Sequence, residues 1–304
     1  MKVKIGEWAV IGGIMLFLIL VQVVSLMLVP PMVTQGFQAF GDPESVLNPI
    51  YYIVLLLLFT GAMLLIIKYK LNWIIQVIMG IAILSTLVYV LFGVIMLAVP
   101  SADPLVAGGI SAVLSVLLTA LLVVYPEWFI IDAVGVLVAA GASALFGVSL
   151  AIVPTLILLI LLAVYDYISV YKTKHMIKLA EGVMDLKMPI MFVMPRRLGY
   201  SFRESKGLPR EGGEREAYFM GLGDAVMPTM LAVSATAFHP ELPKLLGFLN
   251  VPALGAILGT LVSYVVLMYV VVALKKPQAG LPFLCTGAIV GFLLGCLAAG
   301  VWPF

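Results

Sequence analysis

The sequence predicts an all-α, polytopic membrane protein with nine transmembrane helices. Of its 304 residues, 63% are hydrophobic and only 11% are charged, whereas soluble domains carry about 25% charged residues. The hydrophobic residues gather in runs of about 20, the length that a helix needs to cross a bilayer. Because backbone polar groups cannot stay unpaired in lipid, such runs must be helical. A membrane β-barrel is excluded because its short alternating segments are missing.

The predicted helices follow one another from the N-terminus with short connections. The first apolar run, from Trp8 to Val29, is too long for a secretory signal and has no cleavage site after it, so we expect it to remain as a helix. The fourth to sixth runs are nearly continuous, and Glu127, Asp132 and Gly147 are the residues that divide them. The nine spans are predicted at about 7–29, 49–67, 73–98, 105–124, 129–148, 150–171, 217–238, 251–273 and 281–301.

The distribution of basic residues predicts the orientation. With the N-terminus in the cytoplasm, nine alternating helices put all 17 Lys and Arg residues except Lys244 into cytoplasmic segments. Basic residues are retained on that side during insertion, so we expect a cytoplasmic N-terminus and a C-terminus outside. The chain then divides into an N-terminal six-helix region (1–171), a mobile cytoplasmic loop (172–216) and a C-terminal three-helix region (217–304). Residues 188–195 of the loop are apolar and are expected to form a strand or to lie on the bilayer.

Two aspartates are the candidate catalytic residues. Acidic residues inside membrane spans are costly and usually functional. Asp166 precedes Lys172, where the loop begins, by six residues, or about 9 Å of helix. Asp224 follows Arg215 by nine residues, or about 13 Å. The two carboxyl groups are therefore expected to meet at a similar depth, on consecutive antiparallel helices.

Such a pair suits hydrolysis by activated water. Two neighbouring carboxyl groups do not both ionise easily, so one keeps its proton while the other is charged. The charged group can accept a proton from water, and the protonated group can donate to a peptide carbonyl. Glycines beside Asp224 would let a partner helix or a substrate backbone approach closely.

The two aspartates lie in short motifs: Tyr165-Asp166 and, after the long loop, Gly221-Leu222-Gly223-Asp224. With nine spans, this arrangement resembles the presenilin and signal peptide peptidase family, and most closely its archaeal homologues. The resemblance implies an intramembrane aspartic endopeptidase of the GxGD type, in a prokaryotic, archaeal cell membrane. Tyr165 and the motif glycines and leucine would then belong to the active site.

The family has a third motif, Pro-Ala-Leu, at the start of its last helix. A literal copy, Pro252-Ala253-Leu254, begins the eighth span on the outer side and is expected to lie away from the carboxylates. The corresponding position is Pro282-Phe283-Leu284, where Phe283 replaces Ala. The resemblance implies that these three residues help to position substrate.

The expected partners are the lipid bilayer and the transmembrane helices of substrate proteins. A scissile peptide bond must leave its helix, and the extended substrate could pair with a strand edge supplied by 188–195 or by the segment before Tyr218. No cofactor or metal is expected, and the lack of a basic, aromatic-rich domain argues against nucleic acid. A homo-oligomer is possible, and accessory subunits are neither required nor excluded.

Two other functions are compatible with the sequence. A prepilin-peptidase-like enzyme would use a GxGD aspartate but cut just outside the membrane. A proton- or ion-coupled transporter would use Asp166 and Asp224 as carriers, although matched sequence halves are not seen. Asp132, close to Trp128, is predicted to be interfacial or to cap a helix, not to be catalytic.

Overall fold

The computed structural model describes residues 5–173, 191–196, 199–203, 217–274 and 278–303. Within them, eight helices are long and apolar enough to cross a membrane. These are α1 (Ile5–Thr34), α2 (Asn48–Lys68), α3 (Asn72–Ala98), α4 (Pro104–Val124), α5 (Trp128–Ser149), α6 (Ile152–Tyr167) with its π-helical continuation η1 (Ile168–Lys172), α9 (Val251–Leu274) and α10 (Leu281–Ala299). A shorter apolar helix, α8 (Leu222–Phe238), lies between η1 and α9 in the chain. The prediction of a helical, multi-spanning membrane fold is confirmed.

Two short strands precede α8. Strand β1 (Met191–Pro195) pairs antiparallel with β2 (Ala217–Gly221). A helix beginning at residue 217 was therefore the wrong prediction for its first five residues. Of the two alternatives for 188–195, a strand or a segment on the bilayer, the strand is found over 191–195. The remainder of that prediction, 188–190, and most of the predicted mobile loop (174–190, 197–198 and 204–216) lie outside the described residues.

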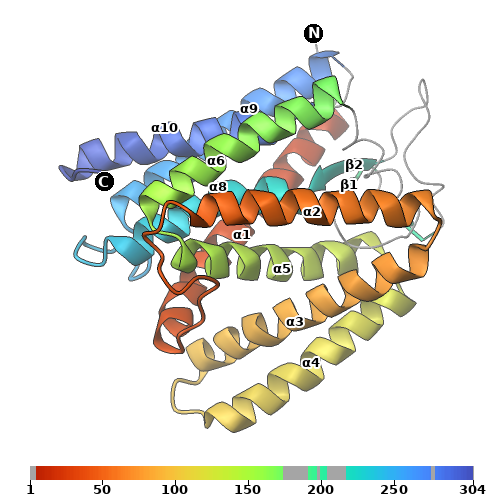
Figure 1. Ribbon diagram of the computed structural model, residues 1–304, viewed down its shortest axis with the longest axis horizontal. Helices are drawn as coiled ribbons and strands as arrows, with labels where there is room; N and C mark the ends of the chain where they lie inside the picture. Colours follow the sequence, from red (N-terminus) through yellow and green to blue (C-terminus); the bar gives the residue numbers. More distant parts are fainter. Residues whose placement is uncertain (1–4, 174–190, 197–198, 204–216, 275–277, 304) are drawn as a thin grey trace.

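The helices surround α8. Figure 1 shows α6, α9 and α10 together on one side, α3 and α4 on the other, and the strands at one end of the bundle. Helix α8 packs against α1, α5, α6, α9 and α10, while α4 reaches the bundle mainly through α3. As a result, most of α8 after its first turn is buried. Asp224 lies in the first turn, at the edge of this buried part.

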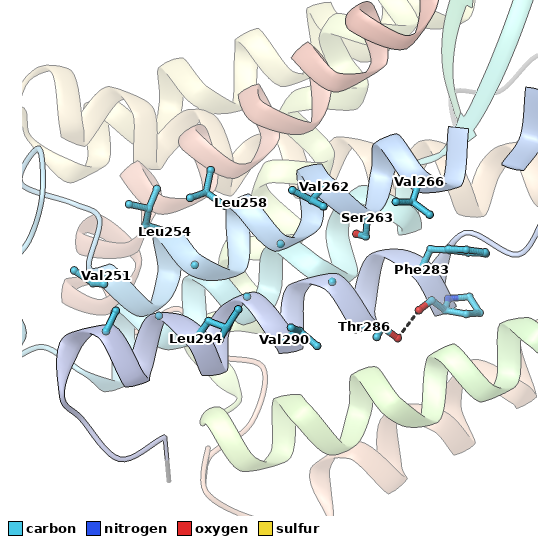
Figure 2. Close-up of a pocket in the computed structure, with 17 residues that line it drawn as sticks. Val251, Leu254, Leu258, Val262, Ser263, Val266, Phe283, Thr286, Val290 and Leu294 are labelled. Atoms are coloured by element: carbon cyan, nitrogen blue, oxygen red, sulfur yellow. Dashed lines mark hydrogen bonds between the residues drawn. The ribbon is translucent and has the colours of Figure 1, made fainter. Parts of the chain in front are cut away.

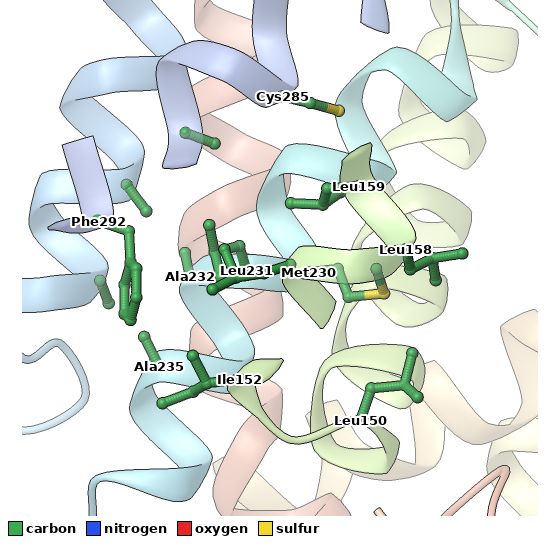
Figure 3. Packing of buried hydrophobic residues seen from close by; sticks show 14 of the residues in the cluster. Leu150, Ile152, Leu158, Leu159, Met230, Leu231, Ala232, Ala235, Cys285 and Phe292 are labelled. Carbon is green, nitrogen blue, oxygen red and sulfur yellow. The ribbon is translucent and has the colours of Figure 1, made fainter. Parts of the chain in front are cut away.

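Small residues and hydroxyl groups allow this close packing. Figure 3 shows Leu158 of α6, Met230 of α8 and Phe292 of α10 in one buried cluster. The Ser234 hydroxyl on α8 donates to the backbone carbonyl of Leu150 at 2.8 Å. In lipid, small side chains and interhelical hydrogen bonds replace the hydrophobic effect as the forces that join helices.

Glycines of the last two helices pack against one another within the bundle. Gly255 and Gly259 of α9 face Gly287, Gly291 and Gly295 of α10. A Cβ added at 259 or 291 would collide with a backbone carbonyl of the opposite helix. The two backbones are thus in direct contact.

Large apolar side chains cover the outside of the bundle. Leu58, Val124 and Leu297 are 67%, 74% and 79% exposed. Extended exposed apolar surface is unusual in a soluble monomer and marks contact with a partner or a membrane. Lipid accounts for this exposure in a chain of membrane-spanning helices.

Candidate active site

Asp166 lies in the last turn of α6, where the helix continues into η1. Its side chain is only 7% exposed. Its Oδ2 accepts a hydrogen bond of 3.2 Å from the backbone N–H of Leu281, and its backbone carbonyl accepts one of 3.0 Å from the Ser169 hydroxyl. π-Helical turns are rare and occur frequently at functional sites.

Asp224 lies in the first turn of α8, three residues after β2 ends. Gly221 is both the last residue of β2 and the N-cap of α8, with an extended backbone (φ −61°, ψ 139°). Leu222 packs toward α5, where a Cβ at Gly135 would lie 3.2 Å from Leu222 Cδ2. Gly223 is exposed, with no atom within 4 Å of the place where a side chain would begin. The motif therefore joins strand to helix and leaves open space beside Asp224.

The N-terminus of α10 brings the two aspartates together. Leu281 donates its N–H to Asp166, and a Cβ at Gly280 would lie 2.9 Å from the carboxyl carbon and both oxygens of Asp224. Both carboxyl groups therefore lie against the first residues of α10. The predicted meeting of Asp166 and Asp224 is thus seen in the geometry.

Gly280 and Leu281 were not predicted as site residues. The structure places Leu284 in the core at 0% exposure, whereas Pro282 and Phe283 line an exposed apolar groove of about 860 Å³ between α9 and α10 (Figure 2). The contacts to the aspartates come from the two residues before Pro282. Proline in the first turn marks a helix N-terminus, where backbone N–H groups lack helical partners. That signal could have identified the Leu281 N–H.

The literal Pro-Ala-Leu copy lies far from the carboxylates, as predicted. Pro252 is the second residue of α9 and contacts Gly295, toward the C-terminal end of α10. Gly295 follows Leu281 by fourteen residues, or about 21 Å of helix.

Tyrosines surround the end of α6. Tyr165 is half-buried beside Asp166. Tyr171 of η1 donates its hydroxyl to Gln278 Oε1 at 2.6 Å and accepts a hydrogen bond of 3.4 Å from the N–H of Ala279. These contacts fix η1 to the segment that leads into α10, and they hold Leu281 near Asp166.

Asp132 does not cap a helix, so that alternative of the prediction was wrong. It is 2% exposed, and Glu127 occupies the N-cap position of α5. Asp132 Oδ1 accepts a hydrogen bond of 2.7 Å from the N–H of Val193 in β1. The sequence could not reveal this contact because it depends on β1 lying beside α5.

Comparison with known proteins identifies the family. The family model described as signal-peptide peptidase, presenilin aspartyl protease matches residues 14–301. The chain belongs to this family. Two solved structures, each described as a presenilin family intramembrane aspartate protease, are similar to it. The one in space group C222 is 36% identical, with a TM-score of 0.68 over 96% of this chain and 99% of its own.

The second structure, in space group P2, is 38% identical, with a TM-score of 0.68 over 94% of this chain and 97% of its own. No curated protein matches the chain. As a member of the presenilin and signal peptide peptidase family, the protein is an intramembrane aspartic endopeptidase. Membership favours this activity over the prepilin-peptidase and transporter alternatives.

Proposed function

We propose that Asp166 and Asp224 are the catalytic pair, and that they hydrolyse peptide bonds within the transmembrane segments of other proteins. The observation that carries this proposal is the N-terminus of α10, which contacts both carboxyl groups, through the Leu281 N–H and through Gly280. Two carboxyl groups whose charges interact can share the roles of base and acid. Which of the two takes each role is left open, because the titration belongs to the pair.

In the proposed reaction, the ionised carboxylate accepts a proton as water attacks the peptide carbonyl carbon. The protonated carboxyl group donates its proton to the carbonyl oxygen, which gives a tetrahedral diol. Collapse of the diol breaks the C–N bond, and the leaving nitrogen receives a proton from the pair. The Leu281 N–H orients Asp166, and the absence of a side chain at Gly280 lets α10 approach Asp224.

An extended substrate can pair with β2. Val193 donates its N–H to Asp132, so the outer edge of β1 is occupied at its centre. Val193 faces Phe219 in the sheet, and facing residues of an antiparallel pair alternate between bonded and non-bonded positions. The N–H and C=O of Phe219 therefore point away from β1. This edge of β2 lies five residues before Asp224, which supports pairing of substrate with β2, next to the segment before Tyr218 that the sequence suggested for this role.

We further infer nine membrane spans, with α8 as the seventh, a cytoplasmic N-terminus and an outer C-terminus. The positions of the basic residues support this orientation, and a 17-residue helix is at the lower limit for crossing a bilayer. In this arrangement the N-terminal six-helix region contributes Asp166, the C-terminal region (217–304) contributes Asp224 and the α10 N-terminus, and the loop 172–216 is cytoplasmic. A prokaryotic cell membrane, such as an archaeal one, is the proposed location.

The test is cleavage of a tagged transmembrane substrate by the purified chain in detergent. We expect Asp166→Ala and Asp224→Ala each to abolish cleavage, because neither carboxyl group can take both roles. Asp103→Asn is the matched control: Asp103 caps α4, and Asn caps helices equally well, so full activity is expected. Activity retained by either dyad variant would refute the assignment.

The same preparation tests the remaining partners. Cleavage by the chain alone would mean that accessory subunits are not needed, and its size in detergent would report a homo-oligomer. Ion flux in liposomes without any proteolysis, lost in the same two variants, would support the transporter alternative.

A further inference from the structure

Asp132 connects α5 to the strand pair that leads into α8. Its carboxyl group is 2% exposed, and among the described residues Oδ2 has no hydrogen-bond partner. The single bond is the one from Val193 to Oδ1, at 2.7 Å. One turn along α5, a Cβ at Gly135 would lie 3.3 Å from the Phe192 ring and 3.2 Å from Leu222. One face of α5 therefore contacts both β1 and the first residue of α8.

Two further carboxylates hold the chain that follows β1. Glu127, at the N-cap of α5, accepts hydrogen bonds from the Ser201 hydroxyl at 2.7 Å and from the Phe202 N–H at 3.1 Å. Glu7 of α1 pairs with Arg196 at 3.1 Å. Three acids from the N-terminal region thus bind one short segment, 193–202, by its backbone or its polar side chains.

We propose that Asp132 is a positioning residue for this protease: by holding Val193, it fixes the β1–β2 pair and thereby the place where α8 begins and Asp224 lies. The proposal rests on the proposed catalytic role of Asp224. Gly221 belongs to β2 and also caps α8, so no flexible loop separates the strand from the helix. A shift of the strands is therefore transmitted to Asp224.

The burial of Asp132 favours positioning over stabilisation. A buried carboxyl group with an unpaired oxygen costs stability, so a purely structural role would be filled better by an apolar residue. A buried hydrogen bond to a charged or polar acceptor fixes geometry strongly. The pair between Glu7 and Arg196 is partly exposed, at 19% and 25%, and exposed ion pairs contribute little. The effect on the site should therefore be greater for Asp132 than for Glu7.

The experiment compares Asp132→Ala, Asp132→Asn and Glu7→Gln in the full chain. The first measurement is amide hydrogen exchange of peptides that cover 191–195 and 217–221, which needs no catalytic activity. Asp132→Ala is expected to speed exchange in both strands. Asp132→Asn keeps an acceptor oxygen for Val193 and is expected to exchange as the wild type does, as is Glu7→Gln.

The second measurement is kcat per active site, with the active sites titrated by a tight-binding transition-state analogue. Loss of a buried hydrogen bond predicts a fall in kcat of about 10- to 100-fold for Asp132→Ala, with KM changed less than about threefold and kcat restored in Asp132→Asn. A structural role would lower the number of active sites but leave kcat per site unchanged.

Three results would overturn the inference. Unchanged exchange in Asp132→Ala would remove the link to the strands. Unchanged kcat per active site would show that the contact serves stability alone. Loss of activity in Asp132→Asn with normal exchange would assign the carboxyl group a chemical role instead. If the wild type itself were inactive, the exchange measurement would still decide whether Asp132 holds the strands, so failure of the proposed protease and failure of this contact are distinguishable.

Discussion

Replacing Gly291 by alanine should separate the last two helices. The added Cβ would collide with the carbonyl oxygen of Gly255 and would lie 2.9 Å from the carbonyl carbon of Gly255 and from the Cα of Gly259. Ordinary carbon contacts are about 3.5–4.0 Å, so α9 and α10 must move apart by roughly 1 Å. The obstacle is backbone rather than a side chain that can rotate. Overpacking of this kind costs about 1–3 kcal/mol.

The assay is denaturation of the purified protein in mixed micelles by a rising fraction of SDS, followed by intrinsic fluorescence. The matched control is Gly61→Ala on α2, where nothing lies within 4 Å of the added methyl group. Alanine favours helix over glycine by up to about 1 kcal/mol, so the control should be as stable as the wild type or more stable. A Gly291→Ala variant as stable as Gly61→Ala would refute the direct backbone contact between α9 and α10.

Two further substitutions test the contacts at helix N-termini. Gly280→Val should lower kcat by about 100-fold, because a side chain at 280 displaces the Asp224 carboxyl group and a misplacement of about 1 Å can reduce the rate that much. Gly280→Ala should lower kcat less. A wild-type kcat in the valine variant would contradict the contact between Gly280 and Asp224. Asn250→Ala should destabilise the protein by about 0.5–2 kcal/mol, since Asn250 caps α9 by accepting from the Ala253 N–H and donates to the Ala235 carbonyl. Thermal unfolding measures this loss, and Asn250→Asp, which keeps the acceptor but not the donor, should fall between.

The aspartate pair could be predicted because both residues lie at a countable distance from the same loop. Helical rise converts a number of residues into a depth, so Asp166 and Asp224 could be matched without knowledge of the fold. The same counting could not find the Leu281 N–H, because a backbone donor carries no residue type in the sequence. The sequence indicates this N–H only indirectly, through Pro282, which marks where a helix begins.

The strand at 217–221 shows another limit. The run Ala-Tyr-Phe-Met-Gly is apolar throughout, and a short apolar run without periodicity does not distinguish a strand from a helix. Pairing with 191–195 decides the matter, and that partner lies about 25 residues away. The contact between Asp132 and Val193 was missed for the same reason, since it depends on the position of β1.

The strand directly before the aspartate-bearing helix can supply the backbone hydrogen bonds that an unwound substrate needs in the proposed reaction. To expose a peptide bond, a substrate helix must give up backbone hydrogen bonds, and in lipid each unpaired group costs several kcal/mol. The N–H and C=O of Phe219, which point away from β1, can replace some of them. Because β2 passes into α8 at Gly221, a substrate strand paired there is held at a fixed distance from Asp224. The pairing that lowers the cost of unwinding also selects which peptide bond meets the carboxyl groups. Asp132 occupies the outer edge of β1 at Val193, so we expect substrate to pair with β2 and not with β1.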